Sequence, residues 1–288
     1  MRGGVSERPR DAGALIAKSI AAYRTAHRDY DERHGEIFNP VEQARLEAAL
    51  RAVVADVTAE GGARRALDLG CGTGNVTAHL VALGLDTVAA DVSPEFVRIA
   101  ERRFAGAAVT PLEIGGDGLP ELEAGAFDVA AAYSVLHHVP DYLGMVEELY
   151  RVLRPGGVLF LDHEASEAVW ARDPALLAFQ QALEDHRHPG WWHPGRKRWQ
   201  RYLMPSKYVF AVRQKIDPLF WLDEGDIHVW PADHIEWGEI ERVLDEAGAE
   251  ILRAEEYLVY RAGYPPELYE EHRGLCADMR LLVARKPR

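Results

Sequence analysis

The fold is decided by Ala66-Leu67-Asp68-Leu69-Gly70-Cys71-Gly72-Thr73-Gly74-Asn75, an apolar stretch that runs into a glycine-rich turn with an acid at its mouth. Three glycines at alternate positions let the backbone turn sharply and approach a ligand more closely than a Cβ would permit. A carboxylate beside this turn suits a cationic ligand and repels a pyrophosphate. We therefore expect a strand and a turn that build a small-molecule pocket.

The spacing of the glycines argues against two common nucleotide sites. A dinucleotide fingerprint would place its third glycine at position 75, but that residue is Asn and the third glycine is Gly74. A phosphate loop would end in Gly-Lys-Ser/Thr, and no lysine occurs between Arg65 and Arg98. A ligand that carries an ammonium and a sulfonium, the charge pattern of S-adenosylmethionine, is the better match for Asp68.

Further stretches follow the turn in the order of a known family. Thr87-Val88-Ala89-Ala90-Asp91 reads as a buried strand that ends in an acid, and Gly116-Asp117-Gly118-Leu119-Pro120 as a loop. Phe127–Ser134 reads as a fourth strand, and a tight turn at Pro155-Gly156-Gly157 precedes a fifth that ends at Asp162. Together these stretches resemble class I S-adenosylmethionine-dependent methyltransferases, in particular their ubiquinone-biosynthesis-like small-molecule branch.

The resemblance implies an α/β fold, namely a Rossmann-like seven-stranded mixed sheet with helices on both faces. It gives an N-terminal tail and helices that cover the cofactor pocket (1–60), a cofactor-binding core (61–164) and a C-terminal part of the core sheet (235–288). The segment 165–234 is then an insertion after strand five. A loop of that length without structure is improbable, so we expect a mostly helical substrate-binding cap. Helices are expected at 14–30, 41–55, 174–186, 205–215 and 235–247, and a strand at 249–260.

The family resemblance also implies roles for individual residues toward S-adenosyl-L-methionine. Asp91 would accept both ribose hydroxyls, Val92 would border the adenine, and Asp117 would take the adenine amino group. Turn formation alone is the alternative explanation for Asp117. The expected cofactor-binding residues are Asp68, Gly70, Cys71, Gly72, Gly74, Asn75, Asp91, Val92, Asp117, Gly118, Ser134, Tyr30 and Phe38.

Three histidines are candidates for a catalytic base. Methyl transfer is an in-line displacement at a sulfonium carbon, so a base is needed only where the acceptor must lose a proton. His163 at the end of strand five is the first candidate, followed by His137 and His138 after strand four, and Glu164 is a candidate to orient one of them. The alternatives are that residues 162–164 simply end a strand and that the other two histidines serve backbone packing.

The insertion carries the candidate residues for substrate binding. All seven tryptophans fall between residues 170 and 237, and eight Lys or Arg without any Asp or Glu occur between Arg187 and Lys215. This composition favours a small, anionic and partly apolar acceptor. The alternative is that the aromatics form the core of the cap and the basic residues its solvated face. The expected substrate-binding residues are Tyr23, Trp191, Trp192, Arg196 and Arg201.

Composition limits the other classes of partner. A net charge of −13 argues against nucleic acid, and no apolar run is long enough to span a bilayer. Two cysteines form no zinc or disulfide pattern, and histidines 186, 188 and 193 have no ligand spacing, so we expect no metal. We expect a cytoplasmic enzyme and leave a homodimer open. The alternative functions are methylation of a sugar or lipid-linked saccharide, and a non-catalytic binding or scaffold protein.

Overall fold

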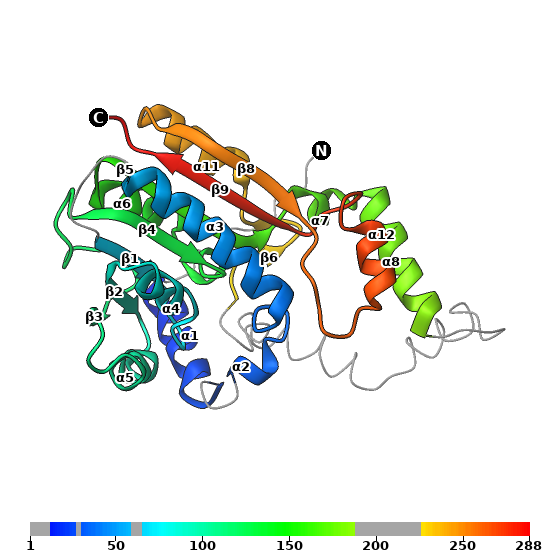
Figure 1. Ribbon diagram of the computed structural model, residues 1–288, viewed down its shortest axis with the longest axis horizontal. Helices are drawn as coiled ribbons and strands as arrows, with labels where there is room; N and C mark the ends of the chain where they lie inside the picture. Colours follow the sequence, from blue (N-terminus) through cyan, green and yellow to red (C-terminus); the bar gives the residue numbers. More distant parts are fainter. Residues whose placement is uncertain (1–11, 27–29, 59–64, 188–225) are drawn as a thin grey trace.

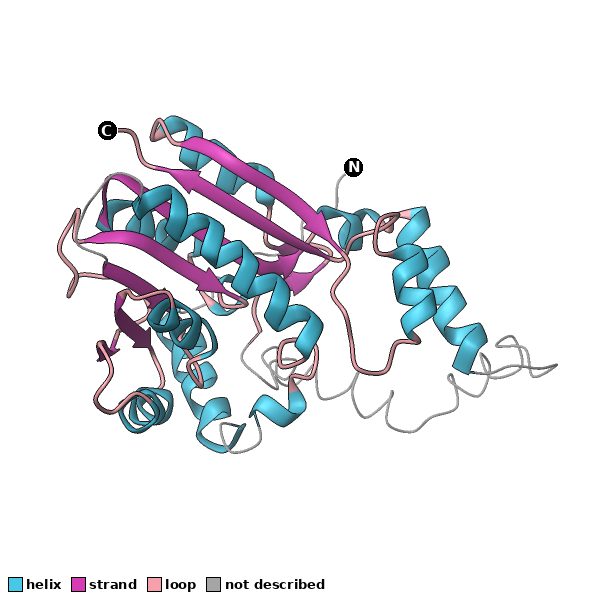
Figure 2. Ribbon diagram, in the orientation of Figure 1, coloured by secondary structure: helices cyan, strands magenta, loops and turns pink. Residues whose placement is uncertain are grey.

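One seven-stranded sheet organises the protein (Figures 1 and 2). The computed structural model describes residues 12–26, 30–58, 65–187 and 226–288. The strand order is β3-β2-β1-β4-β5-β9-β8, with β1 to β5 parallel and β9 antiparallel to both its neighbours. This arrangement confirms the expected fold class. The strands are β1 (Arg65–Leu69), β2 (Asp86–Asp91), β3 (Val109–Glu113), β4 (Phe127–Tyr133), β5 (Leu153–Ala165), β8 (Glu250–Tyr257) and β9 (Met279–Arg285).

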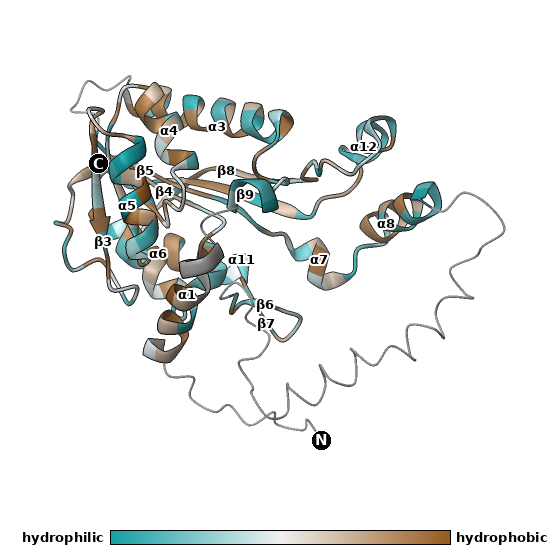
Figure 3. Cartoon of the chain, turned by 90° about the horizontal axis from the view of Figure 1, so that it is seen from below, coloured by the Kyte–Doolittle hydropathy of each residue, from teal (hydrophilic) through white to brown (hydrophobic). Residues whose placement is uncertain are grey.

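Two helical layers bury the central strands. All seven residues of β4 are buried, because a parallel strand in the middle of such a sheet is covered on both faces. On one face Leu46 and Leu80 pack on Val129, and on the other Leu149 packs near Leu67. Figure 3 shows α3 and α4 above the strands and α6 and α11 below them. The covering helices are α3 (Pro40–Thr58), α4 (Asn75–Ala82), α5 (Pro94–Arg103), α6 (Tyr142–Val152) and α11 (Trp237–Glu246).

The sheet order positions the site. The chain leaves β1 for β2 and β3 on one side and then returns to β4 on the other side. Helices of opposite layers therefore diverge at the carboxyl ends of β1 and β4, and this opens a crevice there. Near this end lie α1 (Ala12–Ala26), which covers most of the helix expected at 14–30, and the four-residue α2 (Tyr30–Arg33). Residues 27–29 between them are outside the described part of the chain. A 3₁₀ turn, Leu136–His138, follows β4.

Within the described residues, the segment after β5 packs against the C-terminal region. The predicted helix at 174–186 forms α8 (Pro174–Arg187), which follows α7 (Glu167–Ala171). Leu176 and Phe179 of α8 contact Tyr269 of α12 (Pro266–His272), a helix between β8 and β9 that sequence reasoning did not anticipate. A small hairpin, β6 (Val229–Trp230) and β7 (Asp233–His234), precedes α11. The expected helix at 205–215 falls outside the described residues.

No helix of the described residues combines the length and apolar character needed to cross a membrane. The longest, α3, has 19 residues and alternates apolar and charged side chains.

Trp237 joins α11 to the end of β5, and its replacement is expected to be costly. The side chain is fully buried, and its Nε1 donates to the Ala165 carbonyl at 2.9 Å. Trp237→Ala should lower the free energy of unfolding by about 3–5 kcal/mol, because it leaves a cavity in the core. Trp237→Phe should cost less, since the ring still fills most of the space. Urea unfolding followed by circular dichroism measures both, with the exposed Leu177→Ala on α8 as the control. Equal midpoints for Trp237→Ala and Leu177→Ala would contradict the prediction.

Candidate functional site

Two glycines of the turn after β1 are required by close packing. Gly70 has φ +67°, and a Cβ there would come within 2.2 Å of Val135 Cγ2. Gly74 has φ +91°, and a Cβ there would come within 2.4 Å of the Phe104 ring. A left-handed conformation and a blocked Cβ position together exclude any other residue at either site without rearrangement. The turn is therefore rigidly fixed against the chain after β4 and the end of α5.

Gly72 differs from these two because it faces open space. A Cβ on Gly72 would meet no atom within 4 Å, and φ is +52°. Its backbone N–H donates to Asp91 Oδ2 at 2.9 Å. The missing side chain thus leaves room for a ligand to lie directly on the backbone, as the sequence suggested.

The first of three connected spaces, which we call the apolar cavity, lies beside Gly72 and Asp91. Most of its lining is apolar, and the cavity is partly open to solvent. Asp91 is buried at the end of β2 and accepts a second hydrogen bond from Ser93 N at 2.8 Å. Burial raises the pKa of Asp91 to about 6, against the lowering effect of these backbone hydrogen bonds. The walls of the apolar cavity include Ile16, Ser19, Val92, Phe96, Ile114 and Met145.

A second space, the turn cavity, lies on the other side of the glycine-rich turn. Tyr30, Phe38 and Asn75 line it together with Asp68, which is 1% exposed. Thr77 Oγ1 donates to the Asp68 carboxylate, yet burial raises the pKa of Asp68 to about 7. A buried acid with so little compensation favours a cationic ligand.

Together these two spaces suit the cofactor expected from the sequence. Apolar walls fit a purine, Asp91 fits a ribose, and Asp68 fits an ammonium group. The open position at Gly72 lies on the boundary of both spaces.

Asp117 and Gly118 line a neighbouring depression. Asp117 is exposed, and this depression shares Ile16, Gly116 and Met145 with the apolar cavity. The role of Asp117 toward the adenine amino group therefore stays a prediction. Gly74 packs against Phe104 and lines neither cavity.

A third space, the polar cavity, adjoins the apolar one. It encloses about 840 Å³, and the two share Tyr23, Tyr30, Ser134 and His138. Ser134 has φ +55° at the end of β4. Non-glycine residues rarely adopt this conformation, and such strain is found mainly at functional sites. Charged or titratable side chains predominate in the lining of the polar cavity, including His34, Glu36, His137, His163, Glu164 and Arg261.

Glu164 orients one of the candidate bases. Its carboxylate accepts from the backbone N–H groups of Val135 at 2.9 Å and Leu136 at 2.7 Å, and it contacts His137 Nδ1 at 2.8 Å. Burial by itself would raise the pKa of Glu164, but the charge and hydrogen bond of His137 and the Leu136 N–H lower it overall. His137 therefore turns its other nitrogen, Nε2, away from Glu164. The neighbouring His138 is held by Tyr23, whose hydroxyl lies 2.9 Å from Nε2.

His163, the first candidate from the sequence, is held more deeply. It is 4% exposed, and its Nδ1 lies 3.0 Å from the Tyr133 hydroxyl and 3.3 Å from that of Tyr257. Its ring also stacks on Tyr133, with centroids 4.8 Å apart. This geometry gives His163 a place in the floor of the polar cavity. His138 lines both the polar and the apolar cavity, whereas His137 lines the polar cavity.

Several lining residues were not identified from the sequence. Ser19 had a usable signal, because it shares one face of α1 with Ile16 and Tyr23 at helical spacing. Asp226 and Arg261 had none, since each reaches the polar cavity only through tertiary packing. The proposed substrate contacts Trp191, Trp192, Arg196 and Arg201 lie outside the described residues.

Comparison with known proteins also indicates a methyltransferase. A model of the methyltransferase domain family matches residues 67–161. A ubiquinone biosynthesis O-methyltransferase of Methylococcus capsulatus is 35% identical over 99 residues, which are 34% of this chain and 42% of that protein. The corresponding protein of Paraburkholderia phymatum is 35% identical over 99 residues, covering 34% and 43%. The chain thus spans less than half the length of these curated relatives.

A solved structure extends the likeness over most of the chain. The crystal structure of an S-adenosylmethionine-dependent methyltransferase from Mesorhizobium loti has a TM-score of 0.54 and 25% identity, covering 83% of this chain and 96% of that one. The family and the fold imply S-adenosylmethionine as the cofactor, which agrees with the turn, Gly72 and Asp91. Residues 67–161 therefore match the methyltransferase domain, and the chain is similar in fold to an S-adenosylmethionine-dependent methyltransferase over most of its length.

Proposed function

We propose that this protein transfers a methyl group from S-adenosylmethionine to a small organic acceptor. One observation carries the proposal: the apolar cavity beside Gly72 and Asp91 adjoins the polar cavity, and Ser134 and His138 line both. A donor bound on the glycine-rich turn and an acceptor in the polar cavity would therefore meet at a shared boundary. A protein that served only as a scaffold would have no need of this connected pair of spaces.

Residues of the chain supply binding and orientation. When bound, S-adenosylmethionine offers a methyl group on a sulfonium, which the acceptor attacks in line. Asp91 would hold the ribose, and the apolar side chains of Val92 and Phe96 would hold the adenine and exclude water. Asp68 would stabilise the ammonium of the methionine part. Tyr23 and Tyr30, which border both cavities, would keep solvent from the boundary.

We infer an oxygen acceptor that is anionic and partly apolar. The two curated relatives are O-methyltransferases by name, which favours a hydroxyl. Arg261, which pairs with Asp278 at 3.3 Å, is the cation that lines the polar cavity among its described residues, while Ile235 and Met279 contribute apolar wall. His138 presents its imidazole at the boundary with the apolar cavity, and His137 lies beside it in the polar cavity, where the hydroxyl proton would have to leave. The proton goes to a base as the oxygen bonds the methyl carbon and the carbon–sulfur bond breaks.

Titration of S-adenosylmethionine into the protein by isothermal calorimetry tests the donor site. Asp91→Asn should weaken binding by about 10- to 100-fold, because hydrogen bonds to an ionised group contribute about 1.5–3 kcal/mol. Asp86→Asn is the matched control, since this exposed carboxylate begins the strand that Asp91 ends, and its affinity should equal that of the wild type. Absence of binding by the wild type at millimolar ligand would refute the proposal. A loss in Asp86→Asn equal to that in Asp91→Asn would contradict the role given to Asp91.

Binding of S-adenosylmethionine should strengthen with pH over the acidic range. In the ligand-free protein, burial raises the pKa of Asp91 to about 6 and that of Asp68 to about 7, so both carboxyls are largely protonated at low pH. A cationic ligand prefers the ionised forms, so affinity should rise from about pH 5 to about pH 8, one unit above the higher of the two pKa values, and then level off. Calorimetry across this range measures the slope, and Asp68→Asn should flatten it. A flat profile in the wild type would contradict the assignment of these two acids to the donor site.

A further inference from the structure

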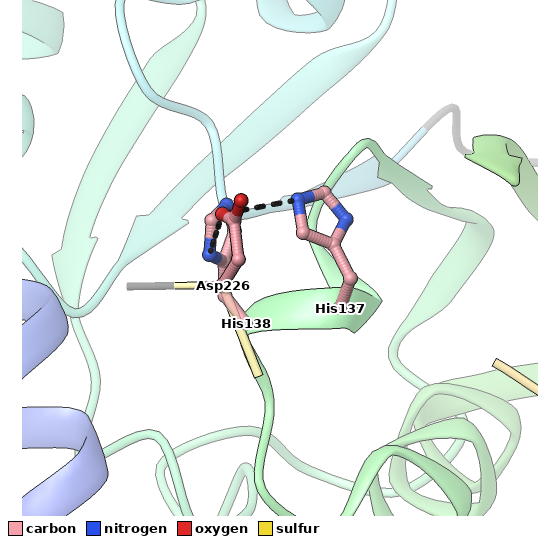
Figure 4. A group of neighbouring side chains, drawn as sticks. All are labelled: His137, His138 and Asp226. Carbon is pink, nitrogen blue, oxygen red and sulfur yellow. Dashed lines mark ion pairs between the residues drawn. The ribbon is translucent and has the colours of Figure 1, made fainter. Parts of the chain in front are cut away.

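We propose that His137, His138 and Asp226 bind a divalent metal ion at the boundary of the polar cavity (Figure 4). The inference concerns a site that the glycine-rich turn does not predict, and its catalytic role rests on the proposed function. Figure 4 shows both imidazoles turned toward the Asp226 carboxylate, with His137 and His138 on the 3₁₀ turn after β4.

The ligand atoms already converge. Asp226 Oδ1 lies 3.4 Å from His138 Nδ1 and 3.8 Å from His137 Nε2, and the three ligand atoms all lie within 4.8 Å of one another. Ligands of one ion at about 2.0–2.2 Å lie roughly 3.0–3.5 Å apart in tetrahedral or octahedral geometry. Small side-chain rotations would therefore bring the three atoms onto a common ion.

The opposite nitrogen of each imidazole is anchored in the way that metal-binding histidines require. His137 Nδ1 contacts Glu164 Oε2 at 2.8 Å, and His138 Nε2 contacts the Tyr23 hydroxyl at 2.9 Å. A histidine ligand usually donates its other N–H to a carboxylate or another acceptor, which fixes the ring and raises its basicity. A simple ion pair with Asp226 would need neither anchor.

The backbone delivers Asp226 to this position. The N–H groups of Ile227 and His228 both donate to the His137 carbonyl, at 2.8 and 3.1 Å. His228 itself is already engaged, with Nδ1 at 2.6 Å from Asp233 and Nε2 at 3.0 Å from the Val139 carbonyl. The chain thus fixes Asp226 beside the two histidines and keeps the third imidazole away.

The donor set selects the class of metal. Two imidazoles and one carboxylate suit zinc and other borderline divalent transition metals, whereas magnesium and calcium prefer oxygen ligands. Three protein ligands leave coordination positions free, and these would face the polar cavity. With the ion bound, His137 and His138 would act as ligands and not as the base. The ion would lower the pKa of an acceptor hydroxyl and fix its direction, and the proton would pass to water in the polar cavity. The ionised oxygen would then bond the methyl carbon as the carbon–sulfur bond breaks.

Zinc binding by the full-length, chelator-treated protein tests the site directly. Calorimetry should show one equivalent of Zn²⁺ bound by the wild type, with affinity at least tenfold weaker in His137→Ala and in Asp226→Asn. Glu164→Gln should weaken binding by about 10- to 100-fold, as loss of an orienting partner does at other metal sites. His186→Gln on the exposed end of α8 is the control for removal of a histidine and should bind as the wild type does. Co²⁺ provides a visible spectrum that should change in Asp226→Asn and stay the same in His186→Gln.

Two outcomes would overturn the proposal: no stoichiometric zinc binding by the wild type, or equal binding by Asp226→Asn. Asp226→Asn preserves side-chain shape, and its circular dichroism spectrum establishes that the variant is folded. Titration of S-adenosylmethionine into the same samples separates the two ideas. Donor binding without zinc binding leaves the methyltransferase proposal intact and removes the metal site. Zinc binding without donor binding supports the metal site and refutes the methyltransferase proposal.

Discussion

Glu164 holds the turn after β4, on which both the apolar cavity and the polar cavity depend. Its buried carboxylate accepts two backbone N–H groups, from Val135 and Leu136, and contacts His137 Nδ1. These bonds tie the end of β5 to the turn after β4, where Ser134 adopts φ +55°. A buried charge that loses such partners becomes strongly destabilising, so this turn has little freedom to move. Val135 in turn occupies the space beside Gly70, and the glycine-rich turn is thereby positioned as well.

A second polar network supports the floor of the polar cavity. Arg45 of α3 pairs with Asp162 of β5 at 2.8 Å and with Glu42. The hydroxyl of Tyr133 donates to Glu42 at 3.0 Å, and that of Tyr257 donates to Asp162 at 3.0 Å. The network thus joins α3 to β4, β5 and β8. Buried networks of this kind contribute little net free energy to folding, but they define one arrangement of the side chains when every member is satisfied. His163 contacts both tyrosines and is therefore held by this network in the floor of the polar cavity.

The sequence was informative wherever function follows from local chemistry. Gly70, Gly72 and Asp91 were identifiable because a left-handed turn demands glycine and because the end of a buried strand rarely carries an acid without a partner. The seven-stranded sheet and its flanking helices followed from the family resemblance that these motifs carry. Asp117 shows the limit, since the direction of a carboxylate in a glycine-rich loop depends on the surrounding packing. With Gly118 it lines the depression that adjoins the apolar cavity, and its role stays a prediction.

The residues on the acceptor side of the site were much harder to predict from the sequence. Asp226 lies 88 positions beyond His138 along the chain, and nothing in its neighbourhood indicates that residues 227 and 228 bond to the His137 carbonyl. Similarly, α12 lies within a segment expected to complete the sheet, yet it packs against α8 through Tyr269. Contacts of this type are set by tertiary packing, which leaves no periodic pattern in the chain.

The two sides of the site also differ in how their buried acids are balanced. Asp68 and Asp91 have raised pKa values because burial exceeds the help they receive from Thr77 and the backbone. The pKa of Glu164 is lowered, since His137 and backbone N–H groups more than offset its burial. On the donor side the buried acids thus receive little compensation from the protein, whereas on the acceptor side Glu164 is already paired. Under the proposed function, S-adenosylmethionine carries a sulfonium and an ammonium, and the demethylated product keeps only the ammonium. The buried acids would therefore favour the donor over the product through their charge.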